Sequence, residues 1–309
     1  MRSLQKLCKL LCLLLVCCML PLGTACIGQA DGGTGYTFTD SAGFTVTLST
    51  RPTRVAVMFS SLAELWLSAG GEVTMTVGES VERGLVPSDV TVLAEGAGKS
   101  PNAEAIIAAA PELVLLSADL ADHVSCAGML RAAGIPTALF HVETFDDYLT
   151  VLKVCTDING RPDLYDSVGL AQKERIDALI AAKPLAGKRI LFARASSSSV
   201  KAKSSADHFA AEMLTQLGAV NIADELAVLS GDLSIEAILQ EDPDYLIFSL
   251  MGNEQAARDN LAALLADGAW ETLTAVQNDC WGCLPKALFH YKPNAAWADA
   301  YAYLAALIP

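Results

Sequence analysis

The chain has 309 residues, of which 52% are hydrophobic and only 6% aromatic, and its formal net charge is −14. This length fits one large domain or two lobes of ordinary size, and the composition suits an α/β protein with helices packed on sheets. Such an acidic chain excludes nucleic acid as an expected partner, because that binding depends on Lys and Arg side chains that neutralise phosphates.

The first 26 residues, MRSLQKLCKLLCLLLVCCMLPLGTAC, differ from the rest of the chain. A basic start, an apolar run of about 12 residues and small residues before Cys26 are typical of a secretory signal. Gly23-Thr-Ala-Cys26 resembles a bacterial lipobox, in which the Cys is acylated, although the first position usually holds a Leu-like residue. An ordinary signal-peptidase cut would leave the same Cys26 unlipidated, and an uncleaved signal anchor is a third reading.

We therefore expect a signal peptide at residues 1–25 and lipidation at Cys26, followed by a flexible Gly-rich tether at 26–35. The mature protein would then be extracytoplasmic and anchored to the cell membrane through its N-terminal lipid.

Short apolar runs alternate with helical patterns along the rest of the chain, which is typical of βα units. The predicted strands are 54–59, 112–117, 136–141, 189–193 and 244–249. Helical patterns follow them after residues 61, 120, 144, 206 and 254. Thr144 is followed by Phe-Asp-Asp, which predicts a helix N-terminus with a capping hydroxyl and acids in the first turn.

Residues 162–183, PDLYDSVGLAQKERIDALIAAK, have a helical pattern of their own. Pro162 suits the first helical turn, and Pro184 and Gly187 end the pattern. About 22 helical residues span roughly 33 Å, which is long for a crossover within a lobe and suits a strut between two. The sequence therefore predicts an N-terminal lobe (36–155), an interlobe helix (156–186) and a C-terminal lobe (187–309).

Two segments repeat one pattern. Residues 102–117 read NAEAIIAAAPELVLLS, and residues 234–249 read SIEAILQEDPDYLIFS. The two segments align over all sixteen positions without a gap. Each copy predicts a short helix, a break at Pro and a buried parallel strand that ends in Ser. Helix–Pro–strand segments also recur by chance, but nine identities or close matches in sixteen positions favour a real lobe-to-lobe similarity. Since ligands bind at the C-terminal strand ends of open α/β sheets, Ser117 and Ser249 should face a cleft.

Taken together, these segments resemble the substrate-binding proteins of ABC importers whose lobes are joined by one long helix. That family binds ferric siderophores, haem and cobalamin. The resemblance rests on the order and spacing of the hairpin and first strand (36–61), the two repeat copies, the strut, and the Trp, Ala-Val, short strand and Pro-led helix of 269–309. It implies an α/β fold of two Rossmann-like lobes with mainly parallel central sheets, a single interlobe helix and a ligand cleft between the lobes.

The resemblance also implies a function without catalysis. We expect a substrate-binding protein that captures a metal chelate, foremost an iron–siderophore complex, and delivers it to a permease dimer with its ATPase. A cobalamin (corrinoid) or haem ligand and a ligand-presenting sensor receptor remain alternatives, as does an enzyme on the same scaffold, which would need clustered Cys or His. No catalytic residues, cofactor or resident metal are expected.

Glu104 and Glu236 occupy the same place in the two repeat copies. In the family, one surface Glu on each lobe docks onto a basic pocket of a permease subunit, and these two positions match. Charge complementarity of this kind sets orientation and encounter rate more than affinity. Acids of a first helical turn are also favoured by the helix dipole alone, so both roles are open from the residues themselves.

Candidate ligand-binding residues lie in the loops that follow the strands. Arg194, Lys201 and Lys292 are conspicuous because the chain has few bases, and they favour a ligand with carboxylates, catecholates or phosphate. His141 and His290 are the candidate metal ligands, although lone histidines are more often packed or solvated. Tyr291 and Met251 share that status because haem-binding relatives use Tyr, His or Met. The full predicted set is Phe59, Ser60, Lys99, Ser117, His141, Arg194, Lys201, Ser249, Met251, His290, Tyr291 and Lys292.

Cys280-Trp-Gly-Cys283 has the C-x-x-C spacing of redox and zinc motifs. It does not open a helix after a strand, and no second Cys or His pair is near it in sequence. The family has a short strand here, so we interpret both cysteines as ordinary strand residues.

Overall fold

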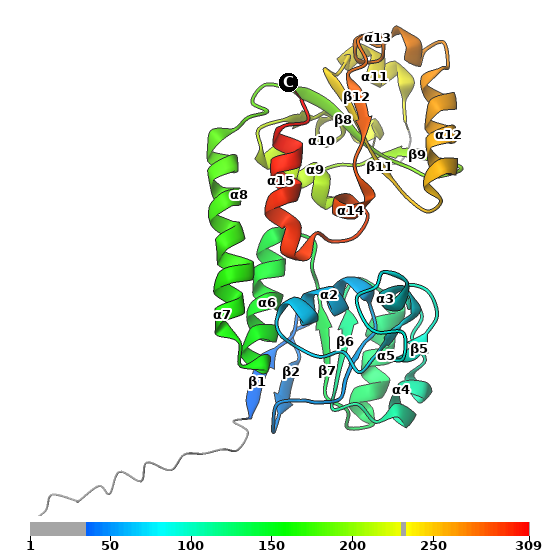
Figure 1. The fold of residues 1–309 in the computed structure, drawn as a ribbon. Coiled ribbons are helices and arrows are strands. Elements are labelled where there is room, and N and C mark those ends of the chain that lie inside the picture. The colour runs from blue at the N-terminus through cyan, green and yellow to red at the C-terminus, as the bar shows by residue number, and fades with distance from the viewer. Residues whose placement is uncertain (1–34, 230–232, 309) are drawn as a thin grey trace, which may run out of the picture. The chain divides into compact units, whose positions relative to one another are not determined.

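The computed structural model describes residues 35–229 and 233–308 (Figure 1). The predicted signal peptide, nearly all of the tether and the lipidation site at Cys26 lie outside the described residues. None of the described helices has the length and apolar character needed to cross a bilayer.

Five parallel strands form the sheet of the N-terminal lobe, in the order β5-β4-β3-β6-β7. They are β3 (Val55–Val57), β4 (Met75–Val77), β5 (Thr91–Ala94), β6 (Leu113–Ser117) and β7 (Thr137–Phe140). The helices of this lobe are α2 (Ser60–Ser68), α3 (Gly78–Glu82), α4 (Ala103–Ala109), α5 (Ala121–Ala132) and α6 (Phe145–Asn159). Every residue of β3 and β6 is buried, as expected of central parallel strands that are covered on both faces.

A hairpin of β1 (Tyr36–Thr39) and β2 (Thr45–Leu48) precedes this sheet. Asp40 in its turn is buried and accepts hydrogen bonds from the Leu139 N–H, at 3.0 Å, and from Arg131, at 2.5 Å. The Ser41 N–H in turn donates to the Leu139 carbonyl at 2.9 Å. The hairpin turn therefore satisfies backbone groups of the edge strand β7, which would otherwise be open to another chain.

A second sheet forms the C-terminal lobe. Its parallel strands follow the order β10-β8-β11-β12, and β9 pairs antiparallel with β8. The strands are β8 (Arg189–Ala195), β9 (Val200–Ala202), β10 (Val220–Asn221), β11 (Tyr245–Leu250) and β12 (Trp281–Cys283). The helical elements are α9 (Phe209–Gln216), α10 (Ile222–Glu225), η2 (Ala227–Leu229), α11 (Ile235–Glu241), α12 (Glu254–Leu265), η3 (Trp270–Thr272), α13 (Thr274–Gln277), α14 (Lys286–Phe289), η4 (Asn294–Ala296) and α15 (Trp297–Ala305).

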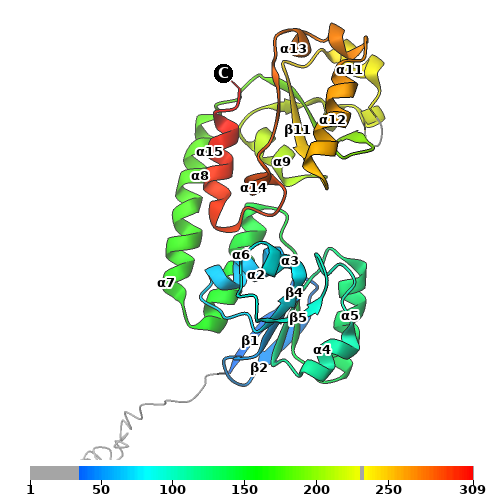
Figure 2. The same cartoon turned by 45° about the vertical axis from the view of Figure 1, so that its right-hand side comes forward.

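A long helical segment connects the lobe that contains the first sheet with the lobe that contains the second. It comprises α7 (Pro162–Leu164), the π-helical η1 (Tyr165–Leu170) and α8 (Ala171–Ala182). Figures 1 and 2 both show α8 beside the C-terminal α15. In η1, a Cβ on Gly169 would lie 2.9 Å from Leu152 and 3.0 Å from Leu149, so glycine is what lets this helix approach α6. The helix predicted over 162–183 is present, whereas the limits of the predicted lobes stay predictions.

The five predicted strands and the helices after them are confirmed, as is the α/β fold. Thr144 accepts a hydrogen bond from the Asp147 N–H, at 3.1 Å, and the Asp147 carboxylate accepts one from the Thr144 N–H, at 2.9 Å, which completes a capping box. The short strands β4, β5, β9 and β10 were not predicted.

The two repeat copies fold alike. The helices α4 and α11 begin after Asn102 and Ser234, and each side chain accepts a hydrogen bond from the N–H three residues on, at 3.1 and 3.4 Å. Both helices end at a residue in the left-handed region, Ala110 with φ 49° and Asp242 with φ 38°. A Pro and then a buried parallel strand follow in each case. The lobe-to-lobe similarity therefore extends to the caps of the helices.

Candidate ligand-binding cleft

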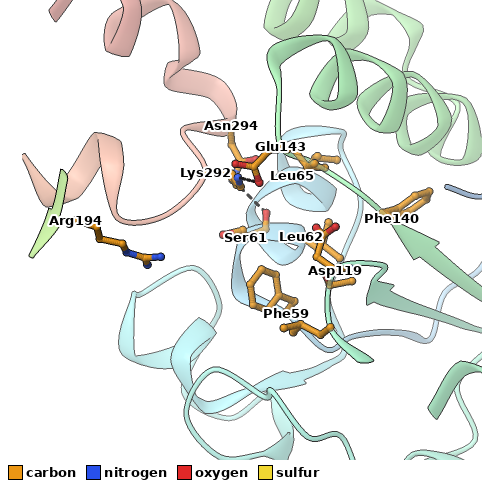
Figure 3. Close-up of a pocket in the computed structure, with 13 residues that line it drawn as sticks. Phe59, Ser61, Leu62, Leu65, Asp119, Phe140, Glu143, Arg194, Lys292 and Asn294 are labelled. Atoms are coloured by element: carbon orange, nitrogen blue, oxygen red, sulfur yellow. Dashed lines mark hydrogen bonds and ion pairs between the residues drawn. The ribbon is translucent and has the colours of Figure 1, made fainter. Parts of the chain in front are cut away.

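A cavity of about 370 Å³ lies at the C-terminal ends of strands from both sheets (Figure 3). The N-terminal lobe provides most of its lining, and three residues from after residue 187 complete it. The lining residues are Phe59, Ser61, Leu62, Leu65, Ser117, Asp119, Leu120, Phe140, Val142, Glu143, Arg194, Lys292 and Asn294. Its position agrees with the general rule for ligand sites in open α/β sheets.

One wall of the cavity is apolar. Phe59 lies two residues after β3, at the N-cap position of α2, so its ring is near the strand end (Figure 3). Leu62 and Leu65 come from the first two turns of α2, and Phe140 ends β7. This surface suits the hydrocarbon or aromatic part of a ligand, since small-molecule sites are mainly apolar with few directed polar groups.

A buried histidine braces this wall. His123 accepts the Ser117 N–H at Nδ1, at 3.1 Å, and its Nε2 lies 2.8 Å from the Gly98 carbonyl. Its ring meets Phe59 edge-on, with centroids 6.3 Å apart. Burial lowers the pKa of His123 despite the Gly98 carbonyl and the nearby Asp122. The neutral ring therefore fixes the Gly98 loop, the Ser117 strand end and Phe59 relative to one another.

The opposite wall carries Arg194, from near the end of β8 (Figure 3). Among residues 35–229 and 233–308, no side chain or carbonyl forms a hydrogen bond or ion pair with it, and its Nε is buried without a partner. Burial lowers the pKa of Arg194, and the Glu143 carboxylate opposes that shift. A half-buried guanidinium without a partner is costly, so this side chain is poised to bind an anion.

Lys292 and Glu143 connect the lobes at the edge of the cavity. The Lys292 Nζ lies 2.5 Å from a Glu143 oxygen and 4.6 Å from the centroid of the Phe209 ring. The other Glu143 oxygen accepts the Phe209 N–H at 3.1 Å. A second link between the lobes is the hydrogen bond that the Asn294 amide donates to the Ser61 carbonyl, at 3.1 Å. The two walls are thus held together by hydrogen bonds beside the ligand space.

Asp119, which also lines the cavity, is already paired. It forms a short contact with Nδ1 of the exposed His141, whose Nε2 lies 3.6 Å from Asp147. Partial burial opposes protonation of His141, but the Asp119, Asp147 and Glu143 carboxylates outweigh it, so the pKa of His141 is raised. His141 is thus engaged by carboxylates at the cavity rim rather than facing inward as a metal ligand.

Of the residues predicted from the sequence, four line the cavity: Phe59, Ser117, Arg194 and Lys292. Ser60 is buried, donates to Glu79 at 2.5 Å and accepts from Arg83. Tyr291 stacks on the Arg83 guanidinium, 3.9 Å from its ring centroid. His290 lies with its Nδ1 3.4 Å from the Leu250 carbonyl, outside the lining. Ser249, which was expected to face the cleft, is instead buried at the end of β11 and does not line the cavity. The other predicted residues are exposed outside the lining: Lys99, His141, Lys201 and Met251.

Sequence reasoning did not single out Asp119, His123 or Asn294. Asp119 had a usable signal, because it lies two residues after the strand end at Ser117. Asn294 follows the Pro that leads into the C-terminal helix, and only the fold brings it to Ser61. His123 lies inside α5 with no local signal of its contacts.

Two further predictions concern metals and thiols. Within the described part of the chain, no three His, Cys, Asp or Glu side chains are arranged to hold a metal ion. Cys280 and Cys283 are free thiols that pack against the apolar cluster under α11 to α13, and burial raises the pKa of Cys283. Cys283 ends β12, as predicted for a strand residue, whereas Cys280 lies just before the strand.

The sequence profile of the periplasmic binding protein family matches residues 55–280. The chain belongs to this family. No curated protein sequence matches it. This periplasmic binding protein shares its two-lobed α/β fold with several solved structures.

A periplasmic solute-binding protein from Veillonella parvula is 17% identical, with 89% of this chain and 86% of that chain aligned and a TM-score of 0.69. The siderophore-binding protein BauB, solved with two acinetobactin molecules and ferric iron, is 17% identical over 89% of this chain and 100% of its own, at a TM-score of 0.69. Staphylococcus aureus SirA, solved with staphyloferrin B, is 16% identical over 87% and 96%, at a TM-score of 0.65. At such identities the similarity concerns the fold.

Proposed function

We propose that this periplasmic binding protein is the extracytoplasmic substrate-binding component of an ABC importer and captures an anionic metal chelate of the iron–siderophore class. The observation that carries the proposal is Arg194, a half-buried cation without a partner among the described residues, at the wall of a cavity bounded by both lobes. In this role the protein binds and releases its ligand and does not catalyse a reaction.

The chemistry of the cavity supports this ligand class. A carboxylate or catecholate oxygen of the ligand would accept paired hydrogen bonds from the Arg194 guanidinium. The ring of Phe59 and the α2 leucines would cover its apolar or aromatic part. BauB and SirA, which share the fold, were both solved with siderophores.

Haem is the main competing ligand, and the lining argues against it. Among the described residues that line the cavity, none is Tyr, His or Met. Tyr291 is instead stacked on Arg83, and Met251 is 40% exposed outside the lining. Iron in a haem would therefore meet no protein ligand of the usual kind in this cavity.

The partner is proposed to be a permease dimer that contacts one Glu on each lobe. Glu104 and Glu236 are both exposed in the first turns of the matching helices α4 and α11. Glu236 accepts a hydrogen bond from Ser234 at 3.3 Å, which leaves its second oxygen for a partner. Attachment to the membrane through a lipid on Cys26 completes the proposal and rests on the sequence alone.

Binding of chelates to the purified protein tests the proposal. Intrinsic fluorescence and thermal unfolding would be followed with ferric catecholate, ferric hydroxycarboxylate and ferric hydroxamate chelates, and with haem and cobalamin. We expect saturable binding of an anionic ferric chelate together with a higher unfolding temperature, because a ligand of the folded state stabilises it. Tight binding of haem or cobalamin, with no response to any ferric chelate, would contradict the proposed ligand class.

A further inference from the structure

Some of the charged side chains that line the cavity form ion pairs and one does not. Within the described part of the chain its ionisable lining residues are Asp119, Glu143, Arg194 and Lys292. Asp119 is paired with His141, and Glu143 with Lys292, so Arg194 alone is unpaired. An incoming anion therefore finds one available cation and a second that is already neutralised.

We infer that Glu143 is a built-in competitor of the ligand: its carboxylate occupies Lys292 and thereby limits how much negative charge the cleft accepts. This inference rests on the proposed function, that the cavity binds an anionic chelate. It makes Glu143 a residue that determines specificity, although it carries the wrong charge to bind such a ligand directly.

The position of the Glu143 carboxylate is set by its backbone. The Glu143 N–H donates to the Asp147 carboxylate at 3.1 Å, within the capping box that starts α6. One carboxylate oxygen accepts the Phe209 N–H at 3.1 Å, and the other meets Lys292 at 2.5 Å. The Glu143 backbone is thus fixed within the N-terminal lobe, and its carboxylate is held by two groups of the C-terminal lobe.

Arg194 and Lys292 line the same cavity, so one bulky anion that spans it can engage both. His208, the residue before α9, is buried, and burial together with the charges of Arg194, Lys292 and Lys203 lowers its pKa to about 3. Its ring centroid lies 4.9 Å from that of Phe209, over which the Lys292 ammonium sits. Both cations also line the same cavity, so they face the same ligand space.

An anion that binds Arg194 meets the full charge of Lys292 only if the Glu143 carboxylate moves away from the ammonium. The carboxylate can do so and keep its hydrogen bond from the Phe209 N–H, so the lobes stay connected. A neutral ligand gains little from the charge of Lys292 and leaves its ion pair with Glu143 intact. Ferric chelates provide both cases, because three bidentate catecholates give Fe³⁺ a net negative charge whereas three hydroxamates give a neutral complex.

The test compares the wild-type protein with Glu143→Gln, which keeps an oxygen for the Phe209 N–H and removes the charge. Affinities for a ferric tris-catecholate and a ferric tris-hydroxamate would be measured by calorimetry at two salt concentrations. We expect the variant to bind the tris-catecholate roughly tenfold more tightly at low salt, with a smaller gain at high salt, since one nearby charge has been removed. The affinity for the neutral tris-hydroxamate should change less than twofold.

Glu174→Gln is the matched control, because it makes the same change of charge at an exposed position of α8 outside the cavity. It should leave both affinities unchanged. An unchanged or weaker affinity of Glu143→Gln for the tris-catecholate, with wild-type binding intact, would overturn the inference and leave the proposed function standing. If the wild-type protein binds neither chelate nor any other ferric complex, the proposed function fails and the inference with it.

Discussion

The two repeat copies share a scaffold and differ in chemistry. Beyond the caps of α4 and α11, the acid that precedes each strand plays one role: Glu112 accepts the Arg54 N–H at 3.1 Å, and Asp244 accepts the Arg189 N–H at 2.7 Å. Each such Arg precedes or opens the strand that pairs with the repeat's own strand. The similarity of the lobes is therefore one of local hydrogen bonding as well as sequence.

At the strand ends the two lobes diverge. The N-terminal lobe contributes an apolar wall built on Phe59 and braced by the neutral His123, whereas the chain after residue 187 contributes Arg194 and Lys292. Neither set alone suits an anionic chelate with apolar parts. The comparison teaches that the repeated segments maintain the fold and its proposed docking faces, while ligand chemistry resides in the unrepeated loops.

The largest effect is expected from removing the pair of matching exposed acids that the two lobes share. Replacing both Glu104 and Glu236 by Lys should abolish chelate uptake by cells, because each exposed acid is proposed to meet a basic pocket. Uptake of radioactive iron would be measured alongside chelate binding by the purified variant, which should be unchanged. Each single reversal should reduce uptake to a similar degree if the lobes dock equivalently. Normal uptake by the double variant would contradict the docking role.

The next largest effect is expected at Arg194, the cation that distinguishes the C-terminal side of the cavity from the N-terminal side. Arg194→Gln should weaken binding of a ferric tris-catecholate by roughly 10- to 100-fold, because hydrogen bonds to a charged group are worth about 1.5–3 kcal/mol. Lys201 is the control, since it lies directly opposite Arg194 in the β8–β9 pairing but is exposed outside the cavity. Calorimetry should find less than a twofold change for Lys201→Gln. Equal losses for the two variants would place the anion site elsewhere.

A smaller effect comes from pH. His208 has a pKa of about 3 in the folded protein, lowered by burial and neighbouring cations, against about 6.5 when unfolded. Between these pKa values His208 is protonated in the unfolded chain and neutral in the folded chain. The free energy of unfolding should therefore fall as the pH drops from about 6.5 toward 3, by up to about 1.4 kcal/mol per pH unit.

His208→Asn removes this dependence and keeps an acceptor for the Ala210 N–H at the start of α9. Urea unfolding at several pH values between 7 and 4 should show a shallower loss of stability for the variant than for the wild type. His123 also has a lowered pKa, through burial, so His123→Asn should change the slope in the same direction. Parallel slopes for wild type and both variants would exclude buried neutral histidines as the cause.

The smallest effect tests whether the repeat copies are energetically alike. Asn102→Ala and Ser234→Ala each remove a helix N-cap and should each lower the free energy of unfolding by about 1 kcal/mol. Chemical denaturation of both variants measures this directly. A large cost at one cap and none at the other would show that the shared geometry does not carry shared energetics.

Sequence patterns predicted the scaffold well for a physical reason. Buried parallel strands such as Leu113–Ser117 and Tyr245–Leu250 appear as apolar runs, and their helices carry caps and breaks at fixed offsets. The missed strands lack that signal. β5, for instance, has two exposed and two half-buried residues, and β10 has only two residues. Such strands form because a neighbour is present, which a local pattern does not reveal.

The cleft was predicted less completely. Phe59, Ser117 and Arg194 follow from the rule that ligands bind at strand ends. Lys292 lies beyond α14 instead, and it was predicted because the chain has few bases. The pattern cannot say which way a loop side chain points: Ser60, next to Phe59, is buried against Glu79. Other contacts join residues far apart in sequence, and only the folded chain brings them together.

The central claim is that an anionic chelate binds in the cavity between the lobes with Arg194 as its anchor. A crystal structure with a ferric tris-catecholate, with iron located by anomalous scattering, tests this most directly. We predict the iron within the cavity lined by Phe59 and Glu143, with a ligand oxygen in hydrogen-bond contact with the Arg194 guanidinium. Iron bound outside this cavity, or a chelate inside it that leaves Arg194 without a partner, would contradict the account.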